Sequence, residues 1–309
     1  MEKKICVIVP MKNGREYILK CLCSLANLDY SNFEVIIVDD GIEKQLLEKI
    51  KEQYSFKILR SNSQGPSYAR NLAAKHTDAE FLAFTDADCV VPPNWLRELI
   101  RGFEKHPQAI SCGGSQQLPE DASKFERKVF FIMKKVGFFA DYMRRTGNKN
   151  IIEVNHNPSC NVMYRRDIFL REGGFLEGLW PGEDVELDYR LRKKGYKLVF
   201  NPLCVVYHYR PQTLYSFLAM MYRYGLATGI LTRKFRIFRK IHIIPAIFLL
   251  IGIIFILSIV FNFFLLFLLL MLLGIGLILI YFEKDIFILF LAGIGLFGWL
   301  GGFLKGVIF

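Results

Sequence analysis

Short apolar runs alternate with helix-patterned stretches along the first part of this 309-residue chain. The runs at 5–9, 33–38, 56–59, 81–85 and 109–114 have the length and composition of buried strands. This alternation predicts an α/β fold with a mostly parallel sheet covered by helices on both faces. In such sheets, ligands bind beyond the carboxyl ends of the strands, so we expect the functional site at that edge.

Residues 120–157 interrupt the alternation with a longer helical stripe. Its apolar positions recur at spacings of four and three: Phe125, Val129, Ile132, Val136, Phe139 and Met143. Basic and further aromatic residues accompany the stripe: Lys128, Phe130, Phe131, Lys134, Lys135, Phe138, Arg144 and Arg145. Such a helix suits a membrane interface. A core-facing helix with a solvated basic side fits the same pattern equally well.

The tail from Ile241 to Phe309 is almost uninterrupted apolar sequence. Its charged residues are Glu283, Lys284, Asp285 and Lys305. A transmembrane helix needs roughly 20 mainly apolar residues, so the tail predicts about three spans. We place them at 241–260, 264–282 and 286–306. The turn at Asn262 is tight, which leaves two longer tilted spans as an alternative.

A basic cluster stands at the entrance to the first predicted span: Arg233, Lys234, Arg236, Arg239 and Lys240. Positive residues beside a span stay on the cytoplasmic side, so the preceding domain is expected there. No apolar stretch precedes that domain, and no cleavable signal peptide is expected. We therefore predict a multi-pass plasma-membrane protein with a cytoplasmic N-terminal domain at 1–232 and a membrane region at 233–309.

The net charge of +11 falls entirely on residues 1–240, because the tail is charge-balanced. Beyond solubility, this excess favours attraction to anionic lipid headgroups or to phosphorylated substrates. Beside a membrane anchor, nucleic acid is the weaker candidate and is not expected as a partner. Oligomeric state is left open.

The seven cysteines show no metal-binding spacing. Cys21 and Cys23 are two positions apart, and the others are scattered. In a reducing cytoplasm they are interpreted as packing residues and free thiols.

The stretch FLAFTDADCVVPPNWL, residues 81–96, ends an apolar strand on Asp86 and Asp88. Two carboxylates held close together repel each other unless a cation lies between them. Such a pair holds Mg²⁺ or Mn²⁺, hard ions that prefer oxygen ligands and bridge to substrate phosphates. The sequence therefore predicts a divalent metal as cofactor and a nucleotide diphosphate as its partner. Pro92-Pro93 is expected to end the strand pattern and begin the next helix.

A second acidic cluster opens the helix-patterned segment GEDVELDYRLRKKG at 182–195. Glu183 and Asp184 fall in its first turn, where the helix dipole favours carboxylates and where one of them can act as general base. Trp180, just before it, offers an aromatic face on which a sugar ring can stack. His208 ends another apolar run and is a candidate third metal ligand.

Taken in order, these segments resemble the inverting family 2 glycosyltransferases, which have the Rossmann-like GT-A nucleotide-sugar fold. The resemblance covers about residues 4–212. Its motifs are VIVPMKNG, VIIVDDG, GPSYARNLAA, FTDADCVVPPNWL, NPSCNVMYRRDIF, GGF, GEDVELDYRLRKKGY and VYHYRP. No single motif is decisive, but their order and spacing together are highly specific. With the apolar tail, the chain is similar to membrane-anchored members that build exopolysaccharides and surface glycans.

The resemblance implies how the nucleotide-sugar donor binds. Pro10 and Asp39 line the base pocket, with Asp40 close by. Arg70 approaches the diphosphate, and Asp86 contacts the ribose or the metal.

The resemblance also implies the metal site and the catalytic group. Asp88 ligates the metal with help from His208, and the metal neutralises charge on the departing nucleoside diphosphate. Asp184 deprotonates the hydroxyl of a glycan or lipid-linked acceptor, while Glu183 supports it or contacts the acceptor.

Two features depart from the family pattern. Ile42-Glu43 stands where the family usually has Ser and a later Asp. The Gln-x-x-Arg-Trp motif of processive members is reduced to Met220–Tyr224, which keeps Arg223 and an aromatic residue as an acceptor-side candidate. This favours the transfer of one sugar per encounter.

Three other functions fit parts of the pattern. A phosphatase of the haloacid dehalogenase type shares a strand followed by Asp-x-Asp, but lacks the Gly-Thr that usually follows. A polyprenyl-phosphate sugar synthase keeps the fold and takes lipid phosphate as acceptor, so it needs no general base. A membrane-tethered scaffold that binds anionic glycans needs no divalent metal.

Overall fold

The computed structural model describes residues 2–12, 17–62, 64–140, 150–237, 240–260, 264–281 and 285–308. The chain divides into two compact units, and each is described by itself. The first unit draws on residues 1–122 and 141–210, and the second on 123–140 and 211–309. This division differs from the predicted boundary after residue 232, because two helices before that point group with the C-terminal helices.

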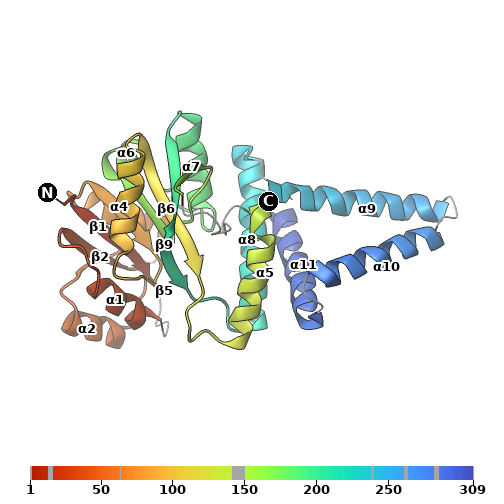
Figure 1. Ribbon diagram of the computed structural model, residues 1–309, viewed down its shortest axis with the longest axis horizontal. Helices are drawn as coiled ribbons and strands as arrows, with labels where there is room; N and C mark the ends of the chain where they lie inside the picture. Colours follow the sequence, from red (N-terminus) through yellow and green to blue (C-terminus); the bar gives the residue numbers. More distant parts are fainter. Residues whose placement is uncertain are drawn as a thin grey trace. The chain divides into compact units, whose positions relative to one another are not determined.

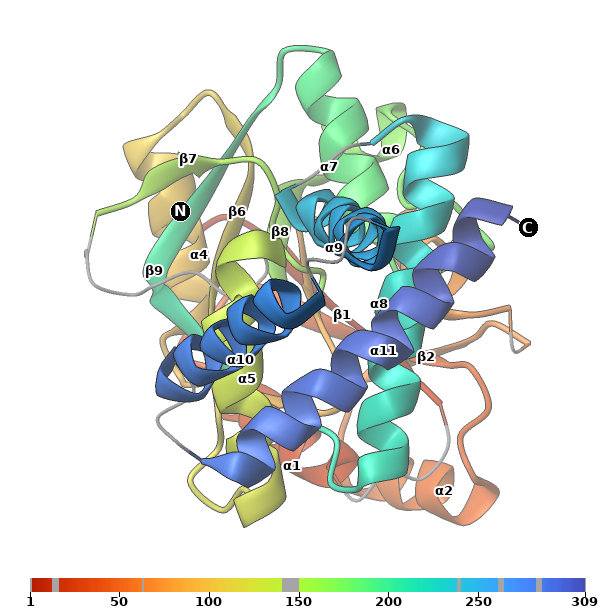
Figure 2. The same ribbon diagram turned by 90° about the vertical axis from the view of Figure 1, so that its right-hand side faces the viewer.

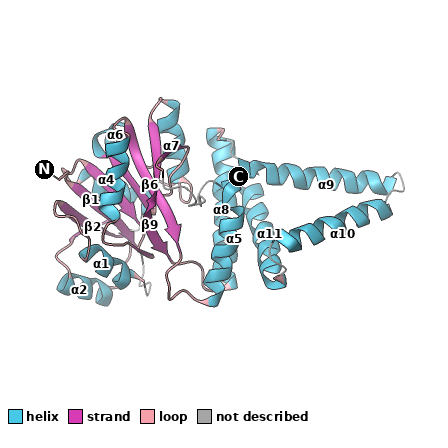
Figure 3. Ribbon diagram, in the orientation of Figure 1, coloured by secondary structure: helices cyan, strands magenta, loops and turns pink. Residues whose placement is uncertain are grey.

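The first unit is built on one sheet, to which the described residues contribute nine strands (Figures 1 and 3). Their order is β3-β2-β1-β4-β8-β6-β9-β5, and β7 also pairs with β9. The bounds are β1 Ile5–Met11, β2 Phe33–Asp39, β3 Lys57–Arg60, β4 Phe81–Thr85, β5 Cys89–Val90, β6 Ala109–Gln117, β7 Ile152–Val154, β8 Asn161–Arg165 and β9 Lys197–His208.

The sheet is parallel in its N-terminal half and mixed beyond it. Strands β3, β2, β1 and β4 all run parallel, as the β-α alternation predicts. Strand β8 then enters antiparallel to both β4 and β6, while β6 and β9 are parallel. The two-residue strand β5 pairs antiparallel with β9, and the sequence did not predict it because it is too short to show a pattern.

Helices cover both faces of this sheet because the strands alternate apolar side chains to each side. Ile5, Val7 and Val9 of β1 pack into one core, and Cys6 and Ile8 into the other. Helices of the first core are α1 Ile18–Ala26, α2 Lys44–Gln53 and α4 Trp95–Lys105. Helices of the second core are α3 Pro66–Lys75, α6 Arg166–Arg171 and α7 Glu183–Lys193. The helices predicted in the β-α repeats are thus confirmed.

The strand register brings the predicted site residues to one edge. Pro10 pairs with Val38, and Met11 with Asp39, at the carboxyl ends of β1 and β2. Ile8 pairs with Phe84, so Asp86 follows β4 at the same edge. The parallel part of the sheet therefore gathers these side chains, as ligand-binding edges of α/β sheets do.

The second unit consists of helices. They are α5 Lys124–Ala140, α8 Leu214–Phe235, the short 3-10 turn η1 Lys240–His242, α9 Ile243–Val260, α10 Phe264–Tyr281 and α11 Ile286–Ile308. Helices α8 and α11 pack along each other, and α5 contacts α11 (Figure 2). A capping box begins α5, since Ser123 Oγ accepts from the Glu126 amide and the Glu126 carboxylate accepts from the Ser123 amide.

The three apolar segments of the tail form helices at the predicted positions. By length and composition, α11 alone among the described residues qualifies as a membrane span, with a mean hydropathy of 2.2. A core helix of a soluble protein passes the same test, so the multi-pass topology stays a prediction. Asn262, Glu283, Lys284, Arg239 and residues 141–149 lie outside the described residues.

Candidate functional site

Two carboxylates and an imidazole meet at the turn between β4 and β5. Asp86 and Asp88 lie in this turn, and His208 ends β9, where it pairs with Cys89. The donor atoms of Asp86, Asp88 and His208 all lie within 4.8 Å of one another. Burial and Arg210 lower the pKa of His208, but Asp88, at 3.3 Å, and a hydrogen bond with Cys160 outweigh them and raise it to about 9.

Arg70 connects this cluster to the start of helix α7. Its side chain comes from α3 and is 2% exposed. One terminal nitrogen lies 2.6 Å from Asp86 Oδ1 and the other 2.8 Å from Glu183 Oε1. Burial lowers the pKa of Arg70, but the neighbouring carboxylates Asp86 and Glu183 reverse the effect and raise it. Arg70 therefore stays charged and holds two acidic side chains from distant parts of the chain.

Helix α7 presents Glu183 and Asp184 differently. Gly182 precedes the helix at φ +106°, a conformation that favours glycine. Asp184 is partly exposed, and its Oδ2 accepts from the Ser159 amide at 3.0 Å while Oδ1 accepts from the Val185 amide at 2.8 Å. Glu183 is buried, and burial together with the charge of Asp184 raises its pKa to about 8. Of these two carboxylates, Asp184 is the more accessible to an acceptor.

A buried network behind Asp184 was not predicted from the sequence. Asp188 lies one turn further along α7 and is fully buried. It accepts from the Tyr164 hydroxyl at 2.7 Å and the Asn157 amide at 2.7 Å, and its Oδ2 lies 2.9 Å from His156 Nδ1. The other nitrogen of His156 lies 4.0 Å from Asp184 Oδ2. The i,i+4 spacing of Asp184 and Asp188 was the signal for it in the sequence.

The predicted nucleotide residues lie at the ends of β1 and β2. Pro10 is half-buried in β1. Asp39 Oδ1 accepts from the amides of Gly41 and Ile42, at 2.9 and 2.7 Å. Asp40 is buried, and its Oδ1 accepts from the Ser61 hydroxyl and from the Gly65 amide. These carboxylates therefore fix the loops that follow β2 and β3.

The two acceptor-side candidates fall in different units. Trp180 precedes α7 in the first unit and is 51% exposed, as a stacking platform requires. Arg223 lies in the middle of α8, in the second unit. The role of Arg223 on the acceptor side therefore stays a prediction.

The cysteines are all free thiols, as predicted from their spacing. Cys23 is exposed and the other six are buried. Cys89 and Cys160 nevertheless meet beside His208, with all three donor atoms within 4.8 Å of one another. Hydrogen bonding from Cys89 lowers the pKa of Cys160 despite burial, with a smaller contribution from His208.

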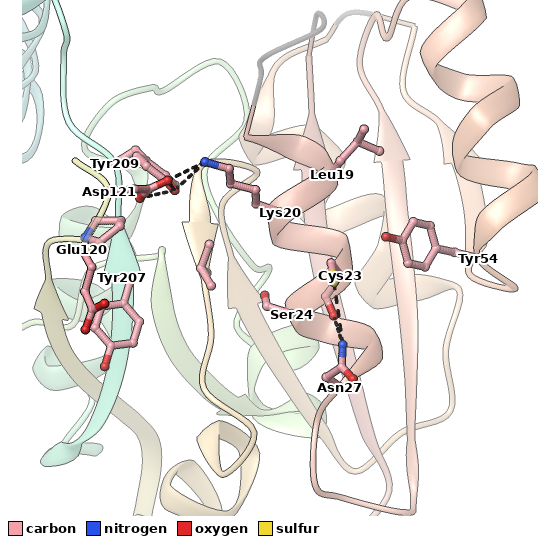
Figure 4. Close-up of a pocket in the computed structure, with 12 residues that line it drawn as sticks. Leu19, Lys20, Cys23, Ser24, Asn27, Tyr54, Glu120, Asp121, Tyr207 and Tyr209 are labelled. Atoms are coloured by element: carbon pink, nitrogen blue, oxygen red, sulfur yellow. Dashed lines mark hydrogen bonds and ion pairs between the residues drawn. The ribbon is translucent and has the colours of Figure 1, made fainter. Parts of the chain in front are cut away.

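A pocket of about 790 Å³ lies in the first unit, and none of Asp86, Asp88 and His208 lines it (Figure 4). Its walls include Tyr54, Tyr207 and Tyr209. Lys20 closes one side, with its Nζ 2.6 Å from Asp121 Oδ2 and 3.1 Å from the Tyr209 hydroxyl. The pocket therefore combines aromatic faces with a satisfied ion pair.

Comparison with known proteins identifies the family of this chain. The profile described as "Glycosyl transferase family 2" matches residues 6–172. This match covers more than half of the chain, which therefore belongs to glycosyl transferase family 2 and is a glycosyltransferase. The resemblance seen in the sequence motifs is confirmed.

Two relatives that match over most of this chain share 26% of the aligned residues with it. A dolichyl N-acetyl-alpha-D-glucosaminyl phosphate 3-beta-D-2,3-diacetamido-2,3-dideoxy-beta-D-glucuronosyltransferase from Methanococcus voltae is 26% identical over 243 residues, 74% of each chain. The pre-mycofactocin glycosyltransferase of Mycobacterium tuberculosis is 26% identical over 229 residues, which are 72% of this chain but 46% of that protein.

A solved structure supports the fold. The mannosyltransferase PcManGT from Pyrobaculum calidifontis, solved with GDP-Man and Mn²⁺, superposes with a TM-score of 0.57 at 18% identity. The match covers 74% of this chain and 63% of that one. At this identity the similarity concerns the fold, and it confirms the GT-A assignment.

Proposed function

We propose that this enzyme transfers a sugar from a nucleotide-diphosphate sugar to a hydroxyl of a glycan or lipid-linked saccharide, with inversion at the anomeric carbon. The observation that carries the proposal is the position of Arg70 between Asp86 and Glu183. This arginine ties the acidic turn suited to a metal–diphosphate to the helix that carries the candidate base. A donor and an acceptor can therefore be held side by side.

The acidic turn fits a divalent metal. Asp86 and Asp88 offer carboxylate oxygens and His208 an imidazole nitrogen, a donor set suited to Mg²⁺ or Mn²⁺. Such an ion, when bound, neutralises charge on the departing diphosphate. Asp86 Oδ1 is occupied by Arg70, which leaves its second oxygen for the metal or ribose. The Mn²⁺ in the PcManGT structure supports this assignment.

Asp184 is the proposed general base. Two amide donors fix its carboxylate, and its side chain remains partly exposed. It takes the proton of the acceptor hydroxyl as the oxygen attacks the anomeric carbon and the bond to the diphosphate breaks. Glu183 is buried and paired with Arg70, so we assign it a supporting role.

Pro10, Asp39 and Asp40 are proposed to line the base pocket, and Trp180 to stack on a sugar. We also propose that the reaction takes place at the cytoplasmic face of the plasma membrane, with the helices α9, α10 and α11 as membrane spans surrounded by membrane lipids. We propose, finally, that the enzyme transfers one sugar per encounter and acts in the synthesis of cell-surface polysaccharides or glycoconjugates.

Asp184→Asn tests the proposed role of Asp184 as general base. Membranes containing the variant are expected to lose nearly all transfer to a hydroxyl acceptor, a drop of about 10²–10⁴-fold, while still binding the nucleotide. Asp167→Asn is the matched control, because Asp167 also lies in the first turn of a helix but is exposed away from the cluster. A screen of nucleotide sugars with Mg²⁺ and Mn²⁺ identifies the donor first.

The alternative is a polyprenyl-phosphate sugar synthase. A phosphate acceptor is already ionised and needs no base, so Asp184→Asn would then have only a mild effect. The name of the Methanococcus relative describes transfer to position 3 of a sugar linked to dolichyl phosphate, which favours a saccharide hydroxyl over a bare lipid phosphate as acceptor. Asp88→Ala with unchanged nucleotide-diphosphate binding and unchanged transfer would exclude the metal-dependent mechanism for both enzymatic functions.

A further inference from the structure

Two buried thiols adjoin the proposed catalytic metal site. Cys89 lies in β5 and is fully buried, and Cys160 immediately precedes β8 and is 4% exposed. Their sulfur atoms and a ring nitrogen of His208 all lie within 4.8 Å of one another. Three separate elements therefore converge to form this group, which we call the thiol site.

The thiol site has a different chemical preference from the acidic turn. Thiolates with an imidazole select Zn²⁺ and other thiophilic ions, whereas carboxylates select Mg²⁺ and Mn²⁺. Among the described residues, the thiol site and the acidic turn are the two groups able to hold a metal ion, and His208 belongs to both. One imidazole therefore serves two neighbouring donor sets of opposite preference.

The spacing suits tetrahedral coordination. With Zn–S bonds of about 2.3 Å, neighbouring sulfur ligands in a tetrahedral site lie about 3.8 Å apart. Small side-chain movements bring donor atoms within 4.8 Å to that separation. Asp88, whose Oδ1 is 3.3 Å from His208 Nε2, or water is available as the fourth ligand.

We propose that Cys89, Cys160 and His208 form an inhibitory site for a thiophilic divalent cation such as Zn²⁺. Coordination needs thiolates and a neutral imidazole, so it releases to solvent the protons that Cys89, Cys160 and His208 carry, and it changes no oxidation state. It also removes His208 from the acidic turn, so the thiophilic ion opposes Mg²⁺ or Mn²⁺ there. Metal binding at the thiol site is inferred from the geometry alone. Inhibition by that metal rests on the proposed transferase function.

Cobalt titration tests the binding without an activity assay. The detergent-solubilised full chain is titrated with Co²⁺, and thiolate-to-metal charge-transfer absorbance is recorded, followed by displacement with Zn²⁺. The Cys23→Ser chain is the background, because Cys23 is the exposed thiol. We expect a thiolate band that saturates at one equivalent and disappears on addition of Zn²⁺. Absence of that band in this chain would overturn the proposal.

Two buried-cysteine variants locate the site. Cys89→Ser/Cys160→Ser is expected to weaken Co²⁺ and Zn²⁺ binding by more than about 100-fold, beyond the effect of losing an outer-shell partner. Cys112→Ser, a buried cysteine in β6, is the matched control and should keep the wild-type band. A double variant that keeps the band overturns the assignment, and if it fails to fold, the spectrum of the Cys23→Ser chain decides.

The activity measurement separates the two hypotheses. With donor and acceptor identified, Zn²⁺ is expected to inhibit transfer less as Mn²⁺ rises, and the double variant should remain active and resist Zn²⁺. Equal inhibition of the double variant would overturn the inhibitory role. A thiolate band without transferase activity would instead leave the thiol site standing and remove the proposed function.

Discussion

Arg70 shows how one residue organises the site. Its position on α3 lets the two ends of its guanidinium reach a turn after β4 and the first turn of α7. A lysine carries the same charge but presents a single ammonium rather than a planar fork, so it is a poor substitute at such a position. The sequence suggested a cation near the diphosphate. The buried pairing with Glu183 required the folded chain, because 113 positions separate the two residues.

Glu183 makes the stability of the first unit depend on pH. Its pKa rises from an ordinary value near 4.5 to about 8 in the folded chain. The folded state therefore binds the proton more tightly, and the resulting stabilisation is complete below pH 4.5 and is lost as the pH rises through about 8. We expect Glu183→Gln to remove this contribution, which is on the order of a few kcal/mol.

Thermal unfolding between pH 5 and 8.5 measures the effect. The wild-type melting temperature should fall with rising pH more steeply than that of Glu183→Gln. Glu177→Gln, in a neighbouring exposed loop position, provides the control and should follow the wild type. Parallel curves for wild type and Glu183→Gln would show that this carboxyl does not titrate as described.

At the scale of elements, the local sequence pattern predicts the bounds of a strand or helix correctly where the segment is long and clearly bounded. Strand β4 has the predicted bounds Phe81–Thr85, because an apolar run is flanked by polar residues on both sides. Helix α4 begins at Trp95 after the two prolines, also as expected. Strand β5 and the meeting of Cys89 with Cys160 depend on contacts between distant segments. Periodicity carries no information about such pairings, which is why the thiol site was missed.

Helices α8 and α11 approach closely through glycine. A Cβ added at Gly302 of α11 would overlap the carbonyl oxygen of Tyr222 in α8, whereas one at Gly301 meets nothing within 4 Å. Replacing glycine by alanine in a helix gains up to about 1 kcal/mol of helix propensity at either position. Gly302→Ala must in addition push the two backbones apart, an overpacking cost of about 1–3 kcal/mol.

Thermal unfolding in detergent distinguishes these neighbouring positions. Gly301→Ala should melt at or above the wild-type temperature, and Gly302→Ala clearly below it. Since both substitutions add the same methyl group, the difference between them isolates the contact between α8 and α11. Equal melting temperatures would mean that the two helices do not pack in this way.

At the scale of the whole molecule, charge and apolar surface are divided along the chain. The net charge of +11 is confined to residues 1–240, and the tail beyond is neutral and largely apolar. Basic residues Arg233, Lys234 and Lys240 precede α9. In a membrane-spanning chain this arrangement keeps the first unit on the cytoplasmic side. The expected orientation follows from the sequence alone, since it depends on the order of charges rather than on folding.

Cys23 provides a direct test of that orientation, because it lies on α1 of the first unit and is the exposed cysteine of the seven. In cells expressing the full chain, a membrane-impermeant maleimide should leave Cys23 unlabelled, and inverted membrane vesicles should allow labelling. Labelling of the detergent-solubilised protein is the positive control for reactivity of the Cys23 thiol. Labelling of the Cys23→Ser variant gives the background from other residues. Labelling in intact cells would place the first unit outside the cytoplasm. The donor would then have to be a sugar available there, because nucleotide sugars are made inside the cell.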